Sequence, residues 1–203
     1  MSIEIKVSKI PISYKKAMIF LDKRVADLKK NRNRELLWIL EHPTTYTAGI
    51  RFNQNEILNK KIKIIKTKRG GKITLHNPGQ KIIYFALNLN NRKKDIRRLI
   101  KILEKSIIEF LWLYKIEGKS DRKNIGIWVN KKKIAAIGLR ISRWIAYHGC
   151  SINIDNNLKQ YLQILPCGLD NQKITSLINE KKIDVKDVNK KLLKIFIKNI
   201  KLI

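Results

Sequence analysis

The stretch that decides the fold class is IIYFALNLNNRKKDIRRLIKILEKSIIEFLWLY, residues 82–114. Its first eight residues, 82–89, are almost continuously apolar, which is typical of a strand buried on both faces. From Ile96 to Tyr114 the apolar side chains return every three or four positions, which predicts a long amphipathic helix. A buried strand followed by such a helix indicates a sheet with helices packed on it.

The same two patterns recur on both sides of this stretch. Further strands are predicted at 3–7, 35–41, 62–67, 72–76, 125–130, 133–141 and 150–154. Further helices are predicted from Ala17 and across 185–203; the second could lie on a membrane surface, but we favour docking on the domain. The sequence therefore predicts an α/β fold, a single domain over 1–203 with a mixed sheet packed by helices.

Length and composition fit a soluble globular protein better than a membrane protein. The chain has 203 residues, of which 44% are hydrophobic and 30% charged. No apolar run approaches the roughly 18 residues that span a bilayer. The first ten residues lack the basic and apolar regions of a signal peptide, so we expect a cytoplasmic protein.

Cysteine and histidine are too sparse for a disulfide framework or an obvious metal site. The two cysteines are Cys150 and Cys167, and a reducing compartment would keep both as thiols. The three histidines, His42, His76 and His148, are far apart and show no CxxC or HExxH spacing. We therefore expect no zinc site.

The net charge is the most unusual number in the sequence. Lys and Arg total 45 against 16 Asp and Glu, which gives +29. The excess is mostly lysine, is spread along the chain and accompanies abundant Ile and Asn, so biased codon usage could explain much of it. A preference for acidic partners, either nucleic acid or acidic proteins, is the alternative.

Three segments interrupt good strand patterns with glycines and polar residues: 68–80, 131–144 and 147–154. In the first, Arg69-Gly70-Gly71 could bring the backbone close to a ligand or could simply turn a hairpin. It is not a P-loop, because GxxxxGK[ST] is absent. In the second, small residues follow Lys133 and leave room for a flat chain beside the strand.

Cys167 stands in LPCGL, residues 165–169, between a proline and a glycine. A thiol reacts as thiolate, so a nucleophilic Cys167 needs a cation or a base nearby. His76, His148 and Lys133 are candidates by residue type, and sequence spacing does not choose among them. Packing is the alternative for Cys167 and the favoured reading for Cys150, which lies within an alternating strand pattern.

Four segments, taken together, resemble the lipoyl(octanoyl) transferase family of lipoate biosynthesis. They are WILEHPTTYTAG at 38–49, RGGKITLHNPGQ at 69–80, KIAAIGLRISRWIAYHG at 133–149 and LPCGL at 165–169. Each is modest alone, but four in the family's order are specific. The resemblance covers the chain from about Trp38 to Leu177.

The resemblance implies a fold like the catalytic domains of biotin and lipoate ligases, and an acyltransferase activity. It places the acyl-thioester nucleophile on Cys167. It makes Lys133 the group that lowers the thiol pKa and acts as base, with His76 and His148 shaping the pocket. The substrate-binding residues that it implies are Arg69, Gly70, Gly71, Lys72, Ile73, Thr74, Leu75, His76, Ala136, Ile137, Gly138, Gly149, Cys150 and Ser151.

The implied reaction moves octanoyl from octanoyl-acyl carrier protein to a lysine of a lipoyl domain. The acceptors would be lipoyl domains of 2-oxoacid dehydrogenase complexes and the glycine cleavage H protein. The resemblance implies no cofactor, metal or ATP, and neither nucleic acid nor membrane as partner.

The sequence departs from the family pattern at Leu75, Asn77, Cys150 and Ser151, and we expect all four near the pocket. They would affect chain-length preference and rate. Two other functions compete: an ATP-dependent lipoate or biotin ligase, and a basic nucleic-acid-binding protein without catalysis. The Gly-Arg-Gly-Arg loop of biotin ligases is absent, as are zinc-finger and RNP motifs.

Overall fold

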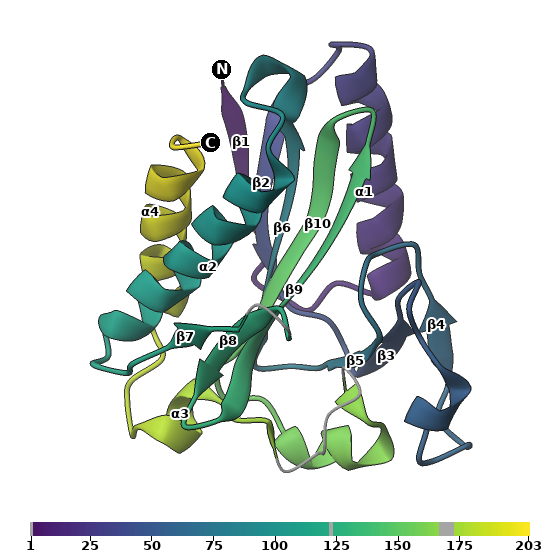
Figure 1. Ribbon diagram of the computed structural model, residues 1–203, viewed down its shortest axis with the longest axis vertical. Helices are drawn as coiled ribbons and strands as arrows, with labels where there is room; N and C mark the ends of the chain where they lie inside the picture. The colour runs from purple at the N-terminus through teal and green to yellow at the C-terminus, as the bar shows by residue number, and fades with distance from the viewer. Residues whose placement is uncertain (1, 122–123, 167–172) are drawn as a thin grey trace.

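A computed structural model describes residues 2–121, 124–166 and 173–203. Its main element is a seven-stranded sheet in the order β1-β2-β6-β10-β9-β8-β7 (Figure 1). The strands are β1 (Ile3–Val7), β2 (Glu35–Leu40), β6 (Gln80–Asn88), β7 (Lys119–Ser120), β8 (Gly126–Val129), β9 (Lys132–Ser142) and β10 (Ile145–Asn153). β1 runs parallel to β2 and the other pairs are antiparallel, so the predicted mixed sheet is confirmed.

Helices cover both faces of this sheet. α1 (Tyr14–Lys29) packs on one face, and α2 (Ile96–Trp112) and α4 (Val188–Ile200) pack on the other (Figure 1). β6 contributes buried side chains to the apolar clusters on both faces of the sheet. Ile83 and Phe85 join the cluster under α2 and α4, whereas Ile82 and Tyr84 join the cluster under α1. This double burial explains why its sequence is continuously apolar instead of alternating.

A smaller sheet stands beside the large one. It contains β4 (Ile64–Lys66), β3 (Thr45–Ala48) and β5 (Ile73–His76) in that order. β4 and β5 both pair with β3 and not with each other, so the Arg69-Gly70-Gly71 segment between them does not close a hairpin. The shorter helical segments are η1 (Gln54–Glu56), η2 (Leu89–Asn91), η3 (Leu158–Gln163) and α3 (Leu177–Glu180).

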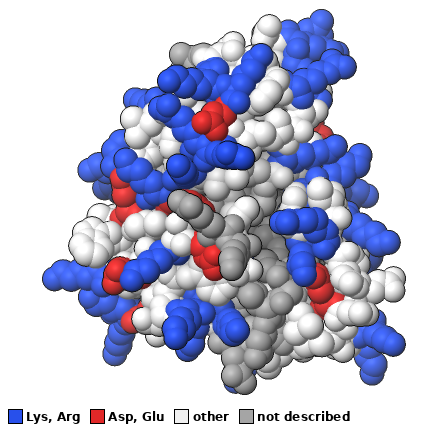
Figure 2. All heavy atoms as spheres, viewed as in Figure 1, with Lys and Arg blue, Asp and Glu red and all other residues white. Residues whose placement is uncertain are grey.

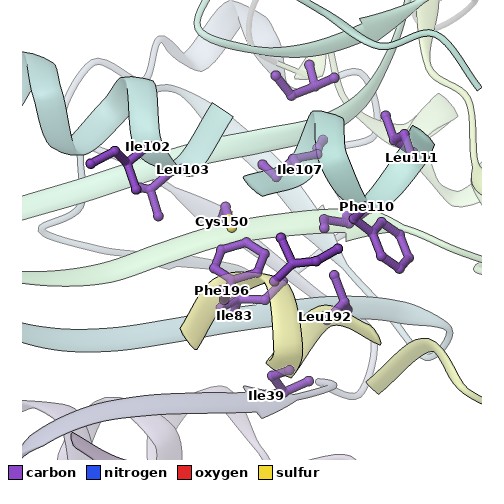
Figure 3. Close-up of a cluster of buried hydrophobic side chains, with 14 of the residues drawn as sticks. Ile39, Ile83, Ile102, Leu103, Ile107, Phe110, Leu111, Cys150, Leu192 and Phe196 are labelled. Carbon is purple, nitrogen blue, oxygen red and sulfur yellow. The ribbon is translucent and has the colours of Figure 1, made fainter. Parts of the chain in front are cut away.

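The C-terminal helix docks on the domain, as predicted. Leu192, Phe196 and Ile200 of α4 are fully buried against α2 and the sheet (Figure 3). Among the described helices, none combines the length and apolarity needed to cross a membrane.

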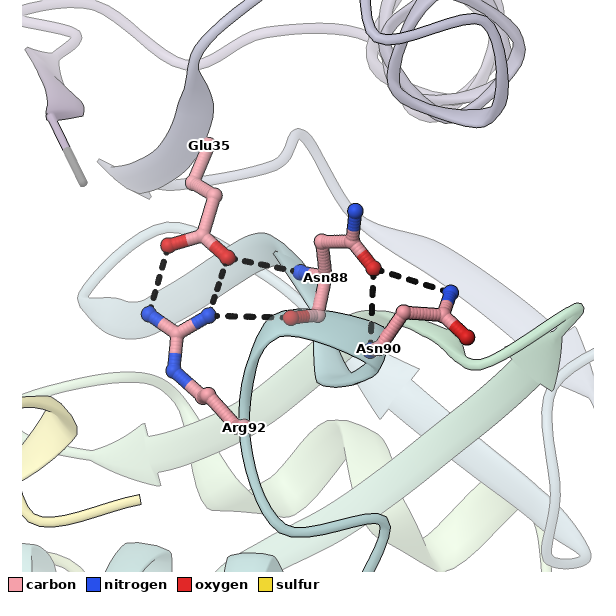
Figure 4. A network of polar contacts seen from close by, with 4 residues as sticks. All are labelled: Glu35, Asn88, Asn90 and Arg92. Atoms are coloured by element: carbon pink, nitrogen blue, oxygen red, sulfur yellow. Dashed lines mark hydrogen bonds and ion pairs between the residues drawn. The ribbon is translucent and has the colours of Figure 1, made fainter.

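Glu35 and Arg92 form a buried polar network at one end of the large sheet (Figure 4). The two terminal guanidinium nitrogens, Nη1 and Nη2, contact the carboxylate, and Arg92 Nη2 lies 2.6 Å from Glu35 Oε2. The same carboxylate accepts a 2.7 Å hydrogen bond from the backbone N–H of Asn88, and Arg92 donates to the Asn88 carbonyl at 3.1 Å. The network thereby joins the start of β2 to the end of β6.

We expect Arg92→Ala to lower the free energy of unfolding by about 3–5 kcal/mol, because it leaves the Glu35 carboxylate buried without its cation. Chemical denaturation measures the loss. Arg97→Ala removes the same side chain from an exposed position on α2 and is the matched control. In a Glu35→Gln background the Arg92→Ala loss should shrink; an equal loss there would contradict the ion-pair explanation.

Candidate active site

A cavity of about 470 Å³ lies between the smaller sheet and strands β6, β9 and β10. Its wall includes Lys133 and all the predicted substrate-binding residues except Ile73 and Leu75. The structure thus gathers three segments that are far apart in the sequence, 69–76, 136–138 and 149–151. The volume falls in the range of about 300–1,000 Å³ that is usual for small-molecule sites.

Ile73 and Leu75 correct the expectation that the whole segment from Arg69 to His76 faces the substrate. Both side chains are fully buried in a separate apolar cluster with Tyr161 and Ile164. Successive side chains of a strand point to opposite faces, so Thr74 and His76 of β5 reach the cavity and their neighbours do not.

The Arg69-Gly70-Gly71 turn is fixed to both sheets, by its backbone on one side and by the Arg69 side chain on the other. Gly70 N–H donates to the Leu139 carbonyl of β9 at 3.0 Å, and Arg69 Nη2 donates to Thr47 O and Oγ1 of β3 at 2.8 Å. Gly71 has φ +91°, and a Cβ at Gly49 would lie 2.3 Å from the Gly71 carbonyl oxygen. Glycine is therefore required where these backbones meet.

β10 brings two unusual residues to the cavity. His148 has φ +68°, which non-glycine residues seldom adopt within a strand. Gly149 follows, and a Cβ there would lie 1.8 Å from the Ile83 carbonyl oxygen of β6. This conformation breaks the expected alternation, which explains why the sequence predicted the strand only from residue 150 and not from Ile145.

The histidines around the cavity are neutral near pH 7. Burial first, and then the charge of the neighbouring His42, lower the pKa of His76 to about 3. Burial lowers the pKa of His148 to about 4, with Arg69 and Arg140 contributing, and burial also lowers the pKa of His42 to about 4. Neutral imidazoles at His76 and His148 do not supply the positive charge that stabilises a thiolate.

His42 does not line the cavity but is hydrogen-bonded to Tyr84, which does. His42 Nδ1 lies 2.6 Å from the Ile12 carbonyl, to which it must donate, so Nε2 accepts from the Tyr84 hydroxyl at 2.9 Å. Sequence reasoning missed Tyr84 as a cavity residue, because it stands in an uninterrupted apolar strand. It also missed Arg51, Ile82, Ile100, Asn124, Ile125 and Leu139.

Lys133 is 5% exposed and lies beside the cavity near the start of β9. Its carbonyl accepts a hydrogen bond from Thr175 N–H at 3.0 Å. Lys133 and Pro166 also line a small hollow of about 20 Å³. Cys167, the predicted nucleophile, lies outside the described residues.

Cys150 belongs mainly to the hydrophobic core. Its side chain faces the cluster beneath α2 and α4, among Ile107 and Phe196 (Figure 3). Burial raises the pKa of its thiol, so the group stays protonated at neutral pH. These surroundings agree with the packing role that its strand pattern indicated.

The four departures from the family pattern are not all near the cavity, contrary to our expectation. Cys150 and Ser151 line it, but Leu75 packs in the smaller sheet's cluster. Asn77 joins a polar network instead, accepting from Asn156 Nδ2 at 2.9 Å and donating to Gln160 Oε1 at 2.8 Å.

In the part of the chain that the structure describes, no group of three His, Cys, Asp or Glu residues is placed to hold a metal ion.

The lipoyl protein ligase A/B catalytic domain family matches residues 13–197. An octanoyltransferase of Bartonella bacilliformis is 39% identical over 96% of this chain and 87% of its own length. One of Ehrlichia chaffeensis is 42% identical over 86% of this chain and 85% of its own. The chain belongs to the octanoyltransferases of this family. The resemblance to this family and the classification as an acyltransferase are confirmed.

Solved structures support the fold assignment. A lipoate-protein ligase A bound with ATP superposes with a TM-score of 0.80 at 12% identity, over 99% of this chain and 86% of that one. A biotin protein ligase from Aquifex aeolicus gives 0.54 at 18% identity, over 98% and 70%. The predicted likeness to lipoate and biotin ligase catalytic domains is confirmed for the fold.

The low histidine pKa values predict that this octanoyltransferase loses stability in mild acid. Between about pH 6.5 and 4 these histidines bind protons in the unfolded chain but not in the folded protein. The free energy of unfolding therefore falls as pH falls. His148→Asn removes one such histidine, and asparagine tolerates the positive φ at this position. Near pH 5 the substitution should reduce the slope of the free energy of unfolding against pH by about 1.4 kcal/mol per pH unit.

Urea denaturation of both proteins at several pH values between 7 and 4.5 measures the slopes. Equal slopes for the wild type and His148→Asn would show that the folded protein already protonates His148.

Proposed function

We propose that the protein transfers octanoyl from octanoyl-acyl carrier protein to a lysine of a lipoyl domain, through a thioester on Cys167. The observation that carries the proposal is the position of Lys133. This buried lysine borders both the main cavity and the small hollow that Pro166 lines, and Cys167 follows Pro166 in the sequence. Octanoyltransferase is also the name of the relatives.

In the first half-reaction, the Cys167 thiolate attacks the carbonyl carbon of the octanoyl thioester. The new S–C bond forms as the bond to the carrier's thiol breaks, and that thiol leaves as thiolate and takes a proton from Lys133. One thioester replaces another, so the step is close to isoenergetic and needs no ATP.

In the second half-reaction, the neutral amine of the acceptor lysine attacks the acyl-enzyme. The C–N bond forms, Lys133 takes the extra proton from nitrogen, and Cys167 leaves as thiolate. The products are an amide and the starting pair of thiolate and ammonium. A thioester has become an amide, which makes this step favourable.

The cavity offers an apolar slot for the octanoyl chain. Ile82, Ile100, Ile125, Ile137 and Leu139 contribute apolar side chains to its wall. Each buried methylene contributes about 0.8 kcal/mol, so the tail could supply about 5 kcal/mol before the costs of binding. That amount separates octanoyl from acetyl, whereas separating eight from ten carbons requires a steric end to the slot.

Intact-protein mass after mixing with octanoyl-acyl carrier protein tests the nucleophile. We expect one octanoyl group on the wild type and on Cys150→Ser, and none on Cys167→Ser. The absence of any adduct on the wild type, with the donor thioester intact, would reject the acyl-enzyme. Acylation from free octanoate that depends on ATP would then favour the ligase alternative.

Lys133→Ala should slow formation of the acyl-enzyme by about 100-fold or more, the contribution usual for a proton-transfer group. Quenched-flow mass measurements give the rate. Lys132→Ala is the matched control, because Lys132 is the exposed neighbour on the same strand. Similar rates for the two variants would remove Lys133 from the mechanism.

The charge of +29 is consistent with acidic protein substrates. Figure 2 shows Lys and Arg side chains over most of one face, with few Asp and Glu between them. A basic surface accelerates encounters with acidic partners. One solved structure of related fold contains a bi-partite lipoate protein ligase and its E2 lipoyl domain from Thermoplasma acidophilum, which supports lipoyl domains as acceptors here.

We expect kcat/KM for octanoyl-acyl carrier protein to fall by about tenfold or more between 20 mM and 300 mM salt, because screening weakens steering. A small donor, octanoyl-pantetheine, lacks the carrier's surface and is the control, with a much weaker salt dependence. Equal dependence for both donors would reject steering by the basic surface.

A further inference from the structure

The strand pair β8–β9 is irregular at the point where Lys133 stands. Ile127 pairs with Ala135, but the next residue, Trp128, pairs with Lys133, so Ile134 is an extra residue in β9. Ile134 and Ala135 both belong to the core cluster as a result, although they are consecutive. Such a β-bulge shifts the alternation by one position, and it turns Lys133 away from the core and toward the cavity.

Gly126 leaves the space through which the Lys133 side chain passes. A Cβ at Gly126 would lie 2.4 Å from Lys133 Cε and 3.2 Å from Nζ. Gly126 also has φ +142°, which other residues rarely adopt. The end of the lysine side chain therefore occupies the volume that a larger residue at 126 would fill.

Trp128 lies directly across the strand pair from Lys133. The Lys133 ammonium nitrogen is 5.4 Å from the centroid of the Trp128 ring, which is a cation–π contact. The indole Nε1–H donates to the Asn124 carbonyl at 3.1 Å, and this bond fixes the plane of the ring. Trp128 is half-buried and is not part of the hydrophobic core clusters.

We propose that Trp128 is a positioning residue, which holds the Lys133 ammonium over Gly126. The inference rests on the proposed function, in which Lys133 stabilises the Cys167 thiolate and moves the proton. Without the ring, the Lys133 ammonium spends less time in this position. The thiolate then forms only at higher pH, and acylation slows.

Two pairs of substitutions test this role. Trp128→Leu removes the ring and should slow acylation from octanoyl-acyl carrier protein by about tenfold, with little change in KM. Trp128→Phe keeps an aromatic face and should retain most of the rate. Trp144→Leu is the matched control, because Trp144 is also partly exposed and lies 5.7 Å from the Lys94 ammonium, away from the cavity.

Alkylation by iodoacetamide, followed by intact mass as a function of pH, reports the thiolate without any substrate. Trp128→Leu should shift the labelling profile of Cys167 to higher pH, and Cys167→Ser is the blank. In a Lys133→Ala background, Trp128→Leu should have no further effect on the profile or the rate. A loss of stability alone would not depend on Lys133 in this way.

The outcomes distinguish failure of the positioning role of Trp128 from failure of the role proposed for Lys133. A normal profile for Trp128→Leu beside a shifted one for Lys133→Ala would overturn the positioning role and leave the proposed function intact. A rise in KM without a change in the profile would also overturn it and make Trp128 a donor-binding residue. If Lys133→Ala itself keeps both profile and rate, the assignment of Lys133 fails.

Discussion

The site depends on one constraint, which is that the central strands are buried on both faces. β6 and β10 carry side chains into the α1 cluster on one side and the α2–α4 cluster on the other. A polar group on these strands must therefore be neutral or well paired, because an unpaired charge in such surroundings is expensive. His148 of β10 is neutral near pH 7, as is His76 of the neighbouring β5, and the guanidinium of Arg69 in the adjoining turn is bound to Thr47.

The same burial gives Lys133 its importance. Since the cavity's histidines are neutral near pH 7 and Arg69 is engaged in fixing the turn to β3, we assign the proposed proton transfers to Lys133. It reaches the cavity only because of the bulge at Ile134 and the gap at Gly126. The chemistry that we propose thus follows from a backbone irregularity and not from the lysine's place in a regular strand.

Much of the fold could be predicted from periodicity, and the failures have physical causes. β6 and α2 are long and strongly patterned, so burial decides them and the prediction matches. β3 has only four residues, TYTA, and no pattern separates them from a loop. The left-handed backbone at His148 and the extra residue at Ile134 depend on contacts between strands, which a single sequence does not show.

The sequence predicted which segments form the site, but not which of their side chains face the cavity. The resemblance marked Arg69 to His76 as a block, whereas β5 turns only Thr74 and His76 to the cavity. Tyr84 and Asn124 were missed, because nothing in their local sequence distinguishes a cavity wall from packing or a loop. Strand alternation in the three-dimensional structure supplies this missing information.

One lysine could serve both half-reactions of the proposed cycle. In the proposed cycle the resting thiolate and the Lys133 ammonium neutralise each other. Acylation converts the thiolate into a neutral thioester and so removes that negative charge from beside Lys133. The departing carrier thiolate takes the proton from Lys133.

The neutral amine that remains is the form required to accept a proton from the acceptor lysine. Release of Cys167 restores the ion pair and closes the cycle. The cation–π contact with Trp128 would hold the regenerated ammonium in place beside the thiolate for the next cycle.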